Sequence, residues 1–157
     1  MPGVIEEAMK VMKFSRHKVD DGWKYLGCGS YRHAYLSPTG VVYKRMKYGG
    51  YDDDMNRNEF KNIQKCKSIK IPGWDVPDAS LFAVESEDII AMEFIEGVDD
   101  NDCERYAEIQ DCSCKNEDGR CVFEIWETPT LHWGLYDIGY ENVIIKDGIR
   151  YLIDVAN

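Results

Sequence analysis

The amino-acid sequence predicts an α+β fold in which most of the sheet lies in the first half of the chain. Short segments rich in β-branched and aromatic residues are separated by turns that contain Gly, Pro or Asp, as is typical of antiparallel strands. These segments are residues 23–26, 34–36, 41–44, 81–84 and 89–95. Near the end of the chain, Asp147-Gly148 separates two β-branched runs, 142–145 and 149–153, and therefore predicts a closing hairpin.

Two helices are expected. Residues 1–14 carry apolar side chains at the i, i+3, i+4 and i+7 spacing of an amphipathic helix. A second helix is expected over residues 55–68, where Asp54 is a candidate N-cap and the sequence Ile-Pro-Gly at 71–73 ends the helical pattern. Residues 98–121 are acidic and rich in cysteine, and they separate the expected sheet from the closing hairpin.

Composition and charge limit the classes of function. The chain has 157 residues, which suits one domain or two small lobes that share a core, and its formal net charge is −10. Binding to nucleic acid or to anionic membranes is disfavoured, because both need clustered Lys and Arg. A Mg²⁺-dependent phosphate site or the capture of a basic partner stays compatible with this charge. We find no signal-peptide pattern and no apolar run near ~18 residues, so we expect a cytoplasmic protein with reduced thiols.

Four of the six cysteines lie close together in the acidic stretch. They are Cys103, Cys112, Cys114 and Cys121. Four thiolates could hold Zn²⁺, but zinc knuckles and ribbons use Cys-x-x-Cys pairs, and Cys112-Ser113-Cys114 is one residue short of that spacing. Free thiols in a surface excursion are therefore favoured, with a structural zinc as the alternative.

Two features of the first half are candidates for phosphate binding. Gly27-Cys28-Gly29 connects two expected strands, and glycines let backbone N–H groups approach phosphate oxygens, although such a hairpin is more often only a turn. Lys44 ends the third expected strand, where it is either a solvated side chain or a point charge for phosphates. Glu59, on the helix that follows, could pair with Lys44 and fix its orientation.

Residues 137–154, which include the closing hairpin, contain three further candidates. Asp137 precedes Asn142 by five positions, and Asn142 opens the hairpin. The carboxylate of Asp137 could accept the proton of an attacking hydroxyl, while the side-chain oxygen of Asn142 could reach Mg²⁺. Asp154 ends the hairpin and is a second candidate ligand for Mg²⁺. Considered alone, each of these residues is better explained as a polar residue at the end of a plain hairpin.

Together, these features occur in the order found in the protein-kinase-like superfamily, which the chain resembles over residues 23–97 and 131–156. Six segments resemble, in order, the Gly-rich loop, the third-strand Lys motif, the Glu-bearing helix, the strand with the hinge, the catalytic loop and the metal-binding motif. They are LGCGSYRHAY, VVYKR, NEFKNIQ, IIAMEFIEG, YDIGYENVII and LIDVA. The chain is most similar to the short kinase domains of T7-type bacteriophages.

The resemblance implies a minimal protein-kinase-like fold with an antiparallel N-lobe sheet and one N-lobe helix. Residues 1–97 would form the N-terminal helix and the N-lobe with its hinge. Residues 98–157 would form a truncated C-lobe that contains the Cys-rich excursion and the catalytic-loop hairpin.

The resemblance also implies roles for single residues. Gly27, Gly29 and Ser30 would cover the phosphates of ATP, Lys44 would bind them, and Glu59 would hold Lys44. The adenine would lie against the gatekeeper and hinge, which are Met92, Glu93, Phe94 and Ile95. Catalysis would use Asp137 as the base, with Asn142 and Asp154 as Mg²⁺ ligands.

The chain departs from the family pattern at several positions. Arg32 replaces the third loop glycine, where it would either crowd the nucleotide or add a phosphate contact. Leu135 and Tyr136 replace the usual His and Arg before the catalytic Asp, and Gly139 replaces a phosphate-contacting Lys. The metal-binding motif lacks its usual Phe-Gly. The sequence ends at Asn157, so we expect no activation segment and no peptide-binding helices.

These observations lead us to expect an ATP- and Mg²⁺-dependent phosphotransferase that acts on a host protein. The alternative is a kinase-fold pseudoenzyme, or an interaction protein that binds and inhibits a host factor through its acidic surface. An adaptor stabilised by zinc at the cysteine cluster is a third reading.

Overall fold

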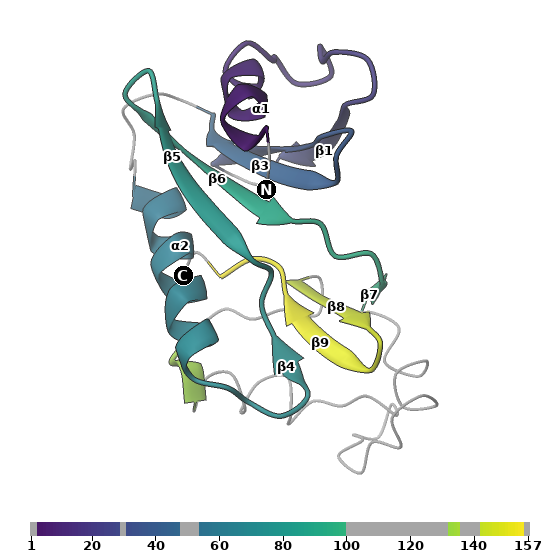
Figure 1. The fold of residues 1–157 in the computed structure, drawn as a ribbon, viewed down its shortest axis with the longest axis vertical. Helices are drawn as coiled ribbons and strands as arrows, with labels where there is room; N and C mark the ends of the chain where they lie inside the picture. The colour runs from purple at the N-terminus through teal and green to yellow at the C-terminus, as the bar shows by residue number, and fades with distance from the viewer. Residues whose placement is uncertain (1–2, 29–30, 48–53, 100–131, 136–141, 156–157) are drawn as a thin grey trace. The chain divides into compact units, whose positions relative to one another are not determined.

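The computed structural model describes residues 3–28, 31–47, 54–99, 132–135 and 142–155 (Figure 1). The chain divides into two compact units. One unit contains residues 1–61 and 78–94, and the other contains residues 62–77 and 95–155. Among the described residues, neither helix is long and apolar enough to cross a membrane.

The first unit contains a five-stranded antiparallel sheet in the order β1-β2-β3-β6-β5. Its strands are β1 (Lys24–Cys28), β2 (Arg32–Leu36), β3 (Val41–Met46), β5 (Ala79–Val84) and β6 (Glu87–Glu93). All five strands expected from the sequence are present. The strands β5 and β6 are connected by two residues, Glu85-Ser86, with φ angles of 51° and 69°. Positive φ at both positions matches the twist of a tight hairpin.

Helix α1 (Val4–Val11) lies against one face of this sheet, as Figure 1 shows. Its buried residues pack with aromatic and aliphatic side chains of the strands to form the core of the first unit. This core includes Val4, Ala8, Val11, Phe14, Trp23, Tyr35, Tyr43, Ile89 and Ala91. Phe14 meets Trp23 edge-on, with ring centroids 4.9 Å apart, a geometry that aromatic pairs prefer.

Helix α2 (Asp54–Ser68) begins and ends close to the expected positions. Residues 54–61 belong to the first unit, and the remaining turns belong to the second. Successive strand residues point to opposite faces of a sheet. Tyr43 faces α1 and the core, so its neighbour Lys44 points to the opposite face, where it meets α2 through Glu59.

The second unit contains a four-stranded sheet in the order β4-β9-β8-β7. Its strands are β4 (Trp74–Asp75), β7 (Val98–Asp99), β8 (Val143–Lys146) and β9 (Ile149–Leu152). The hairpin β8–β9 turns at Asp147-Gly148, as the sequence predicts. The strands β4 and β7 were not predicted, because two residues carry no periodicity and their pairing depends on distant partners.

Candidate functional site

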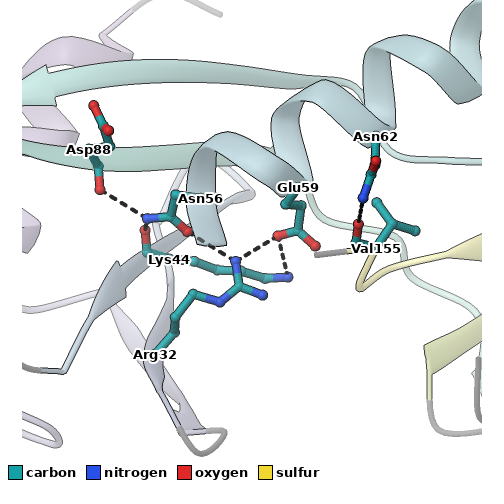
Figure 2. Close-up of polar contacts among 7 residues, drawn as sticks. All are labelled: Arg32, Lys44, Asn56, Glu59, Asn62, Asp88 and Val155. Carbon is teal, nitrogen blue, oxygen red and sulfur yellow. Dashed lines mark hydrogen bonds and ion pairs between the residues drawn. The ribbon is translucent and has the colours of Figure 1, made fainter. Parts of the chain in front are cut away.

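The ion pair between Lys44 and Glu59 is the centre of the candidate site (Figure 2). Lys44 Nζ lies 3.0 Å from Glu59 Oε1, and the Glu59 side chain is 0% exposed while that of Lys44 is 12% exposed. Strand β3 fixes Lys44 between Ala34 of β2 and Ile90 of β6. The second turn of α2 supplies Glu59. The contact predicted between these two residues is therefore present, whereas their roles in catalysis stay a prediction.

Arg32 shares this carboxylate, which the sequence did not predict. Its Nη1 lies 2.9 Å from Glu59 Oε1, and its side chain is 7% exposed. Arg32 therefore binds Glu59 within the protein, and its expected effect on a nucleotide, crowding or a phosphate contact, stays a prediction. The alternation of side chains along a strand could have indicated that Arg32 lies on the same face as Lys44, because Arg32 and Ala34 share one face of β2 and Ala34 pairs with Lys44.

Asn56 is a second residue of the site that the sequence did not reveal. It is buried in the first turn of α2, and its Oδ1 accepts a hydrogen bond from Arg32 Nη1 at 3.0 Å. Its Nδ2 donates to the carbonyl oxygens of Lys44, at 3.0 Å, and of Asp88, at 2.9 Å (Figure 2). All the polar atoms of this side chain are thus used to join α2 to the sheet. An Asn near a helix N-terminus is usually solvated, so its sequence position gave no indication of this role.

The Gly-rich segment is described only in part. Gly27 has φ 121°, a backbone conformation that side chains of L-residues rarely adopt, and the β1–β2 register shifts between Tyr25 and Gly27. The segment therefore needs glycine at this position for its backbone shape. Gly29 and Ser30 lie outside the described residues, and the expected phosphate contacts of the loop stay a prediction.

The expected adenine-facing segment runs from the end of β6 into the chain that follows. Met92 and Ile95 are buried, whereas Glu93 is exposed and Phe94 is half-buried. Met92 pairs with Val42 of β3, and the amide of Phe94 donates to the carbonyl oxygen of Gly40 at 3.4 Å. These contacts fix the backbone of the segment, and its contact with an adenine stays a prediction.

In the second unit, the two expected Mg²⁺ ligands flank the β8–β9 hairpin. Asn142 precedes β8, Asp154 follows β9, and the amide of Ile153 donates to the carbonyl oxygen of Asn142 at 2.9 Å. The backbone at Asn142 is thus joined to the residue that precedes Asp154. Asn62 of α2 donates from Nδ2 to the carbonyl oxygen of Val155 at 2.5 Å, next to Asp154. Asp137 lies outside the described residues.

The donor types at the hairpin ends fit magnesium. Asn142 and Asp154 offer side-chain oxygens, and Mg²⁺ in phosphate sites is usually held by one or two carboxylates together with substrate phosphates. Within the described ranges, no group of three or more His, Cys, Asp or Glu side chains could hold a metal ion. The four clustered cysteines considered for zinc, residues 103 to 121, lie outside those ranges.

Cys66 is the one cysteine whose side-chain environment is described, and it is buried in α2. Burial raises the pKa of its thiol to about 12. A thiol with so high a pKa is protonated at neutral pH and is a poor nucleophile. Cys66 is therefore a packing residue of the second unit.

No protein-family model and no curated protein matches the chain. Solved structures do match. A mutant form of the Mycobacterium tuberculosis PknI kinase domain is 16% identical with a TM-score of 0.50, and the match covers 91% of this chain and 62% of that domain. The GDP and kanamycin complex of the aminoglycoside phosphotransferase APH(2")-IIia is 13% identical with a TM-score of 0.41, covering 62% of this chain and 32% of that one.

The chain thus spans about one third of the length of the aminoglycoside phosphotransferase and about three fifths of the PknI domain. At these identities, the likeness to PknI concerns the fold alone. The antiparallel five-stranded sheet, with α2 placed between its third and fourth strands in sequence, agrees with it. The chain has a small α+β fold of the protein-kinase-like type.

Proposed function

We propose that the chain binds ATP with Mg²⁺ and transfers its γ-phosphoryl group to a protein acceptor, as a minimal kinase of the short bacteriophage type. The observation that carries this proposal is the buried Lys44–Glu59 pair in a kinase-like fold. A buried ion pair is weak evidence for stability, because removing two charges from water offsets much of their attraction. A function that needs the cation explains its presence better.

In protein kinases, a lysine on the third strand contacts the nucleotide phosphates and is oriented by a helix glutamate. Lys44 and Glu59 have these element positions and this contact. In the proposed site, Lys44 neutralises charge on the α- and β-phosphates. Gly27, Gly29 and Ser30 lie over the phosphates, and residues 92–95 contact the adenine.

The second half of the proposed site acts on the acceptor. Asp137 orients the acceptor hydroxyl and accepts its proton, as the catalytic-loop Asp does in kinases. Asn142 and Asp154 hold Mg²⁺, which neutralises charge that develops on the transferring phosphoryl group. The backbone hydrogen bond between Ile153 and Asn142 supports this pairing of ligands, because it brings Asn142 close in the fold to the residue that precedes Asp154.

Nucleotide binding tests the first step of the proposal. ATP with Mg²⁺ should raise the melting temperature, and at about 100 times Kd the expected stabilisation is about 2.7 kcal/mol. Lys44→Met should abolish most of the shift, whereas Lys61→Met, an exposed lysine of α2, should retain it. An unchanged melting temperature of the wild type at millimolar ATP would refute the nucleotide site.

Phosphoryl transfer tests the second step. Transfer of label from γ-³²P-ATP to the chain itself or to a mixture of host proteins should be lost in Asp137→Ala. If ATP binds but the wild type transfers no label, the alternative of a kinase-fold interaction protein is favoured. The net charge of −10 supports that alternative, because an acidic surface can occupy a basic partner.

A further inference from the structure

One buried carboxylate oxygen of the first unit receives two cations. Glu59 Oε1 lies 2.9 Å from Arg32 Nη1 and 3.0 Å from Lys44 Nζ, and Glu59 is fully buried (Figure 2). The same Arg32 nitrogen donates to Asn56, which in turn donates to β3 and β6 backbone carbonyls. The N-terminal half of α2 is thereby joined to β2, β3 and β6.

We propose that Arg32 is a positioning residue with two effects. It clamps Glu59 and the first turns of α2 to the sheet, so that the Lys44–Glu59 pair exists before any nucleotide binds. It also keeps Glu59 paired with a cation when Lys44 turns towards a phosphate. The second effect rests on the proposed function, whereas the first does not.

The physical reason is the cost of a buried charge. A carboxylate taken out of water and left without a cation destabilises a protein strongly, which is why removing one partner of a buried pair is so costly. With Lys44 as the sole cation, a phosphate that attracts Lys44 would weaken the hold on Glu59. Arg32 removes this competition, because it is a second cation on Glu59 and a guanidinium donates along fixed directions.

The clamp also has a consequence for regulation. In protein kinases the lysine–glutamate pair must be in place for phosphoryl transfer, and control of the helix that carries the glutamate switches activity. Asn56 and Arg32 fasten this helix to three strands by buried hydrogen bonds. The pair is therefore formed constitutively, with no separate ordering step of α2.

A double-mutant cycle without nucleotide tests the clamp. Arg32→Met and Lys44→Met each leave Glu59 with one of these two cations, whereas the double variant removes both. Each variant should raise the unfolding equilibrium constant relative to the wild type. The increase in the double variant should exceed the product of the two single-variant increases by about tenfold, a coupling typical of residues that share a partner. Lys61, an exposed lysine of the same helix, provides the control, and Lys61→Met with Lys44→Met should be multiplicative. A multiplicative result for Arg32 and Lys44 overturns the proposal.

Hydrogen exchange gives a second readout that does not depend on global unfolding. Amides of residues 55–61 should exchange faster in Arg32→Met than in Lys61→Met, and Arg32→Lys should restore part of the protection because it retains a cation near Glu59. Equal exchange in Arg32→Met and in the wild type contradicts the clamp, even if Arg32→Met lowers the overall stability.

Affinity measurements test the second effect. Arg32→Met should weaken ATP binding about tenfold, which corresponds to about 1.4 kcal/mol, and should leave adenosine binding unchanged, because adenosine has no phosphate to attract Lys44. Equal weakening of ATP and adenosine would indicate a general loss of structure and would overturn this effect. If the wild type binds no ATP, both the proposed function and this second effect fail. The clamp is then tested by the double-mutant cycle, which uses no nucleotide.

Discussion

Asn62 Nδ2 donates a hydrogen bond of 2.5 Å to the carbonyl oxygen of Val155, the residue that follows Asp154 (Figure 2). The Val155 side chain is itself buried in the second unit. In protein kinases, a Phe follows the metal-binding Asp, whereas Val155 follows Asp154 in this chain. Here a side-chain amide and a small buried side chain together fix the backbone next to Asp154.

Replacement of Asn62 should therefore affect both stability and the proposed magnesium site. Asn62→Ala removes the donor and should lower the free energy of unfolding by about 1 kcal/mol. Asn62→Asp should cost more, because a carboxylate cannot donate and repels the carbonyl oxygen. Urea denaturation measures both losses, and Asn58→Ala, an exposed Asn of the same helix, is the control. Equal stability of Asn62→Ala and Asn58→Ala would show that the bond contributes nothing.

Glu59→Gln should be among the most destabilising single changes in the first unit. The neutral amide leaves Arg32 and Lys44 facing each other across a buried position. Loss of one partner of a buried ion pair typically costs about 3–5 kcal/mol. The free energy of unfolding, measured in urea, should fall by that amount, whereas Glu6→Gln on the exposed face of α1 should be neutral. A loss below about 1 kcal/mol would show that the cluster contributes little to stability.

The sequence predicted the elements that have strong local signals. Strand segments with β-branched residues and the Asp147-Gly148 turn appear where expected, because their periodicity and turn chemistry act within a few residues. Helix α2 was equally predictable from its stripe of apolar residues and from the Ile-Pro-Gly sequence that follows it. Lys44 and Glu59 could be paired in advance because they lie on adjacent elements in a familiar order.

The remainder of the site depends on tertiary contacts that no local pattern encodes. The ion pair of Arg32 with Glu59 was not predicted, because it depends on the register of β2 and β3 and on the position of α2. Nothing in the sequence pointed to Asn56, whose three hydrogen bonds join α2 to the sheet. The contacts of both residues depend on where α2 packs. That position follows from the burial of one whole face of the helix and not from residues adjacent in sequence.

The variant Gly97→Ala tests how closely the backbone must approach at the short pairing of β7 with β8. A Cβ at this position would lie 2.8 Å from Ile144 Cγ2 and would overlap the carbonyl oxygen of Ile145. Gly97→Ala must therefore push the β7 backbone away from β8, and we expect a loss of about 1–3 kcal/mol, as for other overpacked sites. Urea denaturation of Gly97→Ala and of its exposed neighbour variant Glu96→Ala measures the difference. Equal stabilities would mean that the backbone moves there at no cost.

His33 predicts a pH dependence of stability in the first unit. Burial, followed by the charges of Lys47, Arg16 and Arg45, lowers the pKa of His33 below its usual 6.5. Its Nδ1 lies 2.9 Å from the Tyr25 hydroxyl. As the pH falls from 6.5 towards the lowered pKa, the unfolded chain binds the proton more readily than the folded one. Stability should therefore be complete above about pH 6.5 and should fall as the medium is acidified.

Urea midpoints between about pH 5 and pH 8 measure this effect in a range where most carboxylates remain ionised. His33→Gln retains polar atoms that can bond Tyr25 but cannot titrate, so it should flatten the pH dependence. His17→Gln, at an exposed position, should leave the pH dependence in place. An NMR titration of the His33 ring gives the same quantity directly. A pKa at or above 6.5 in the folded protein would contradict the proposed influence of burial and of the three cations.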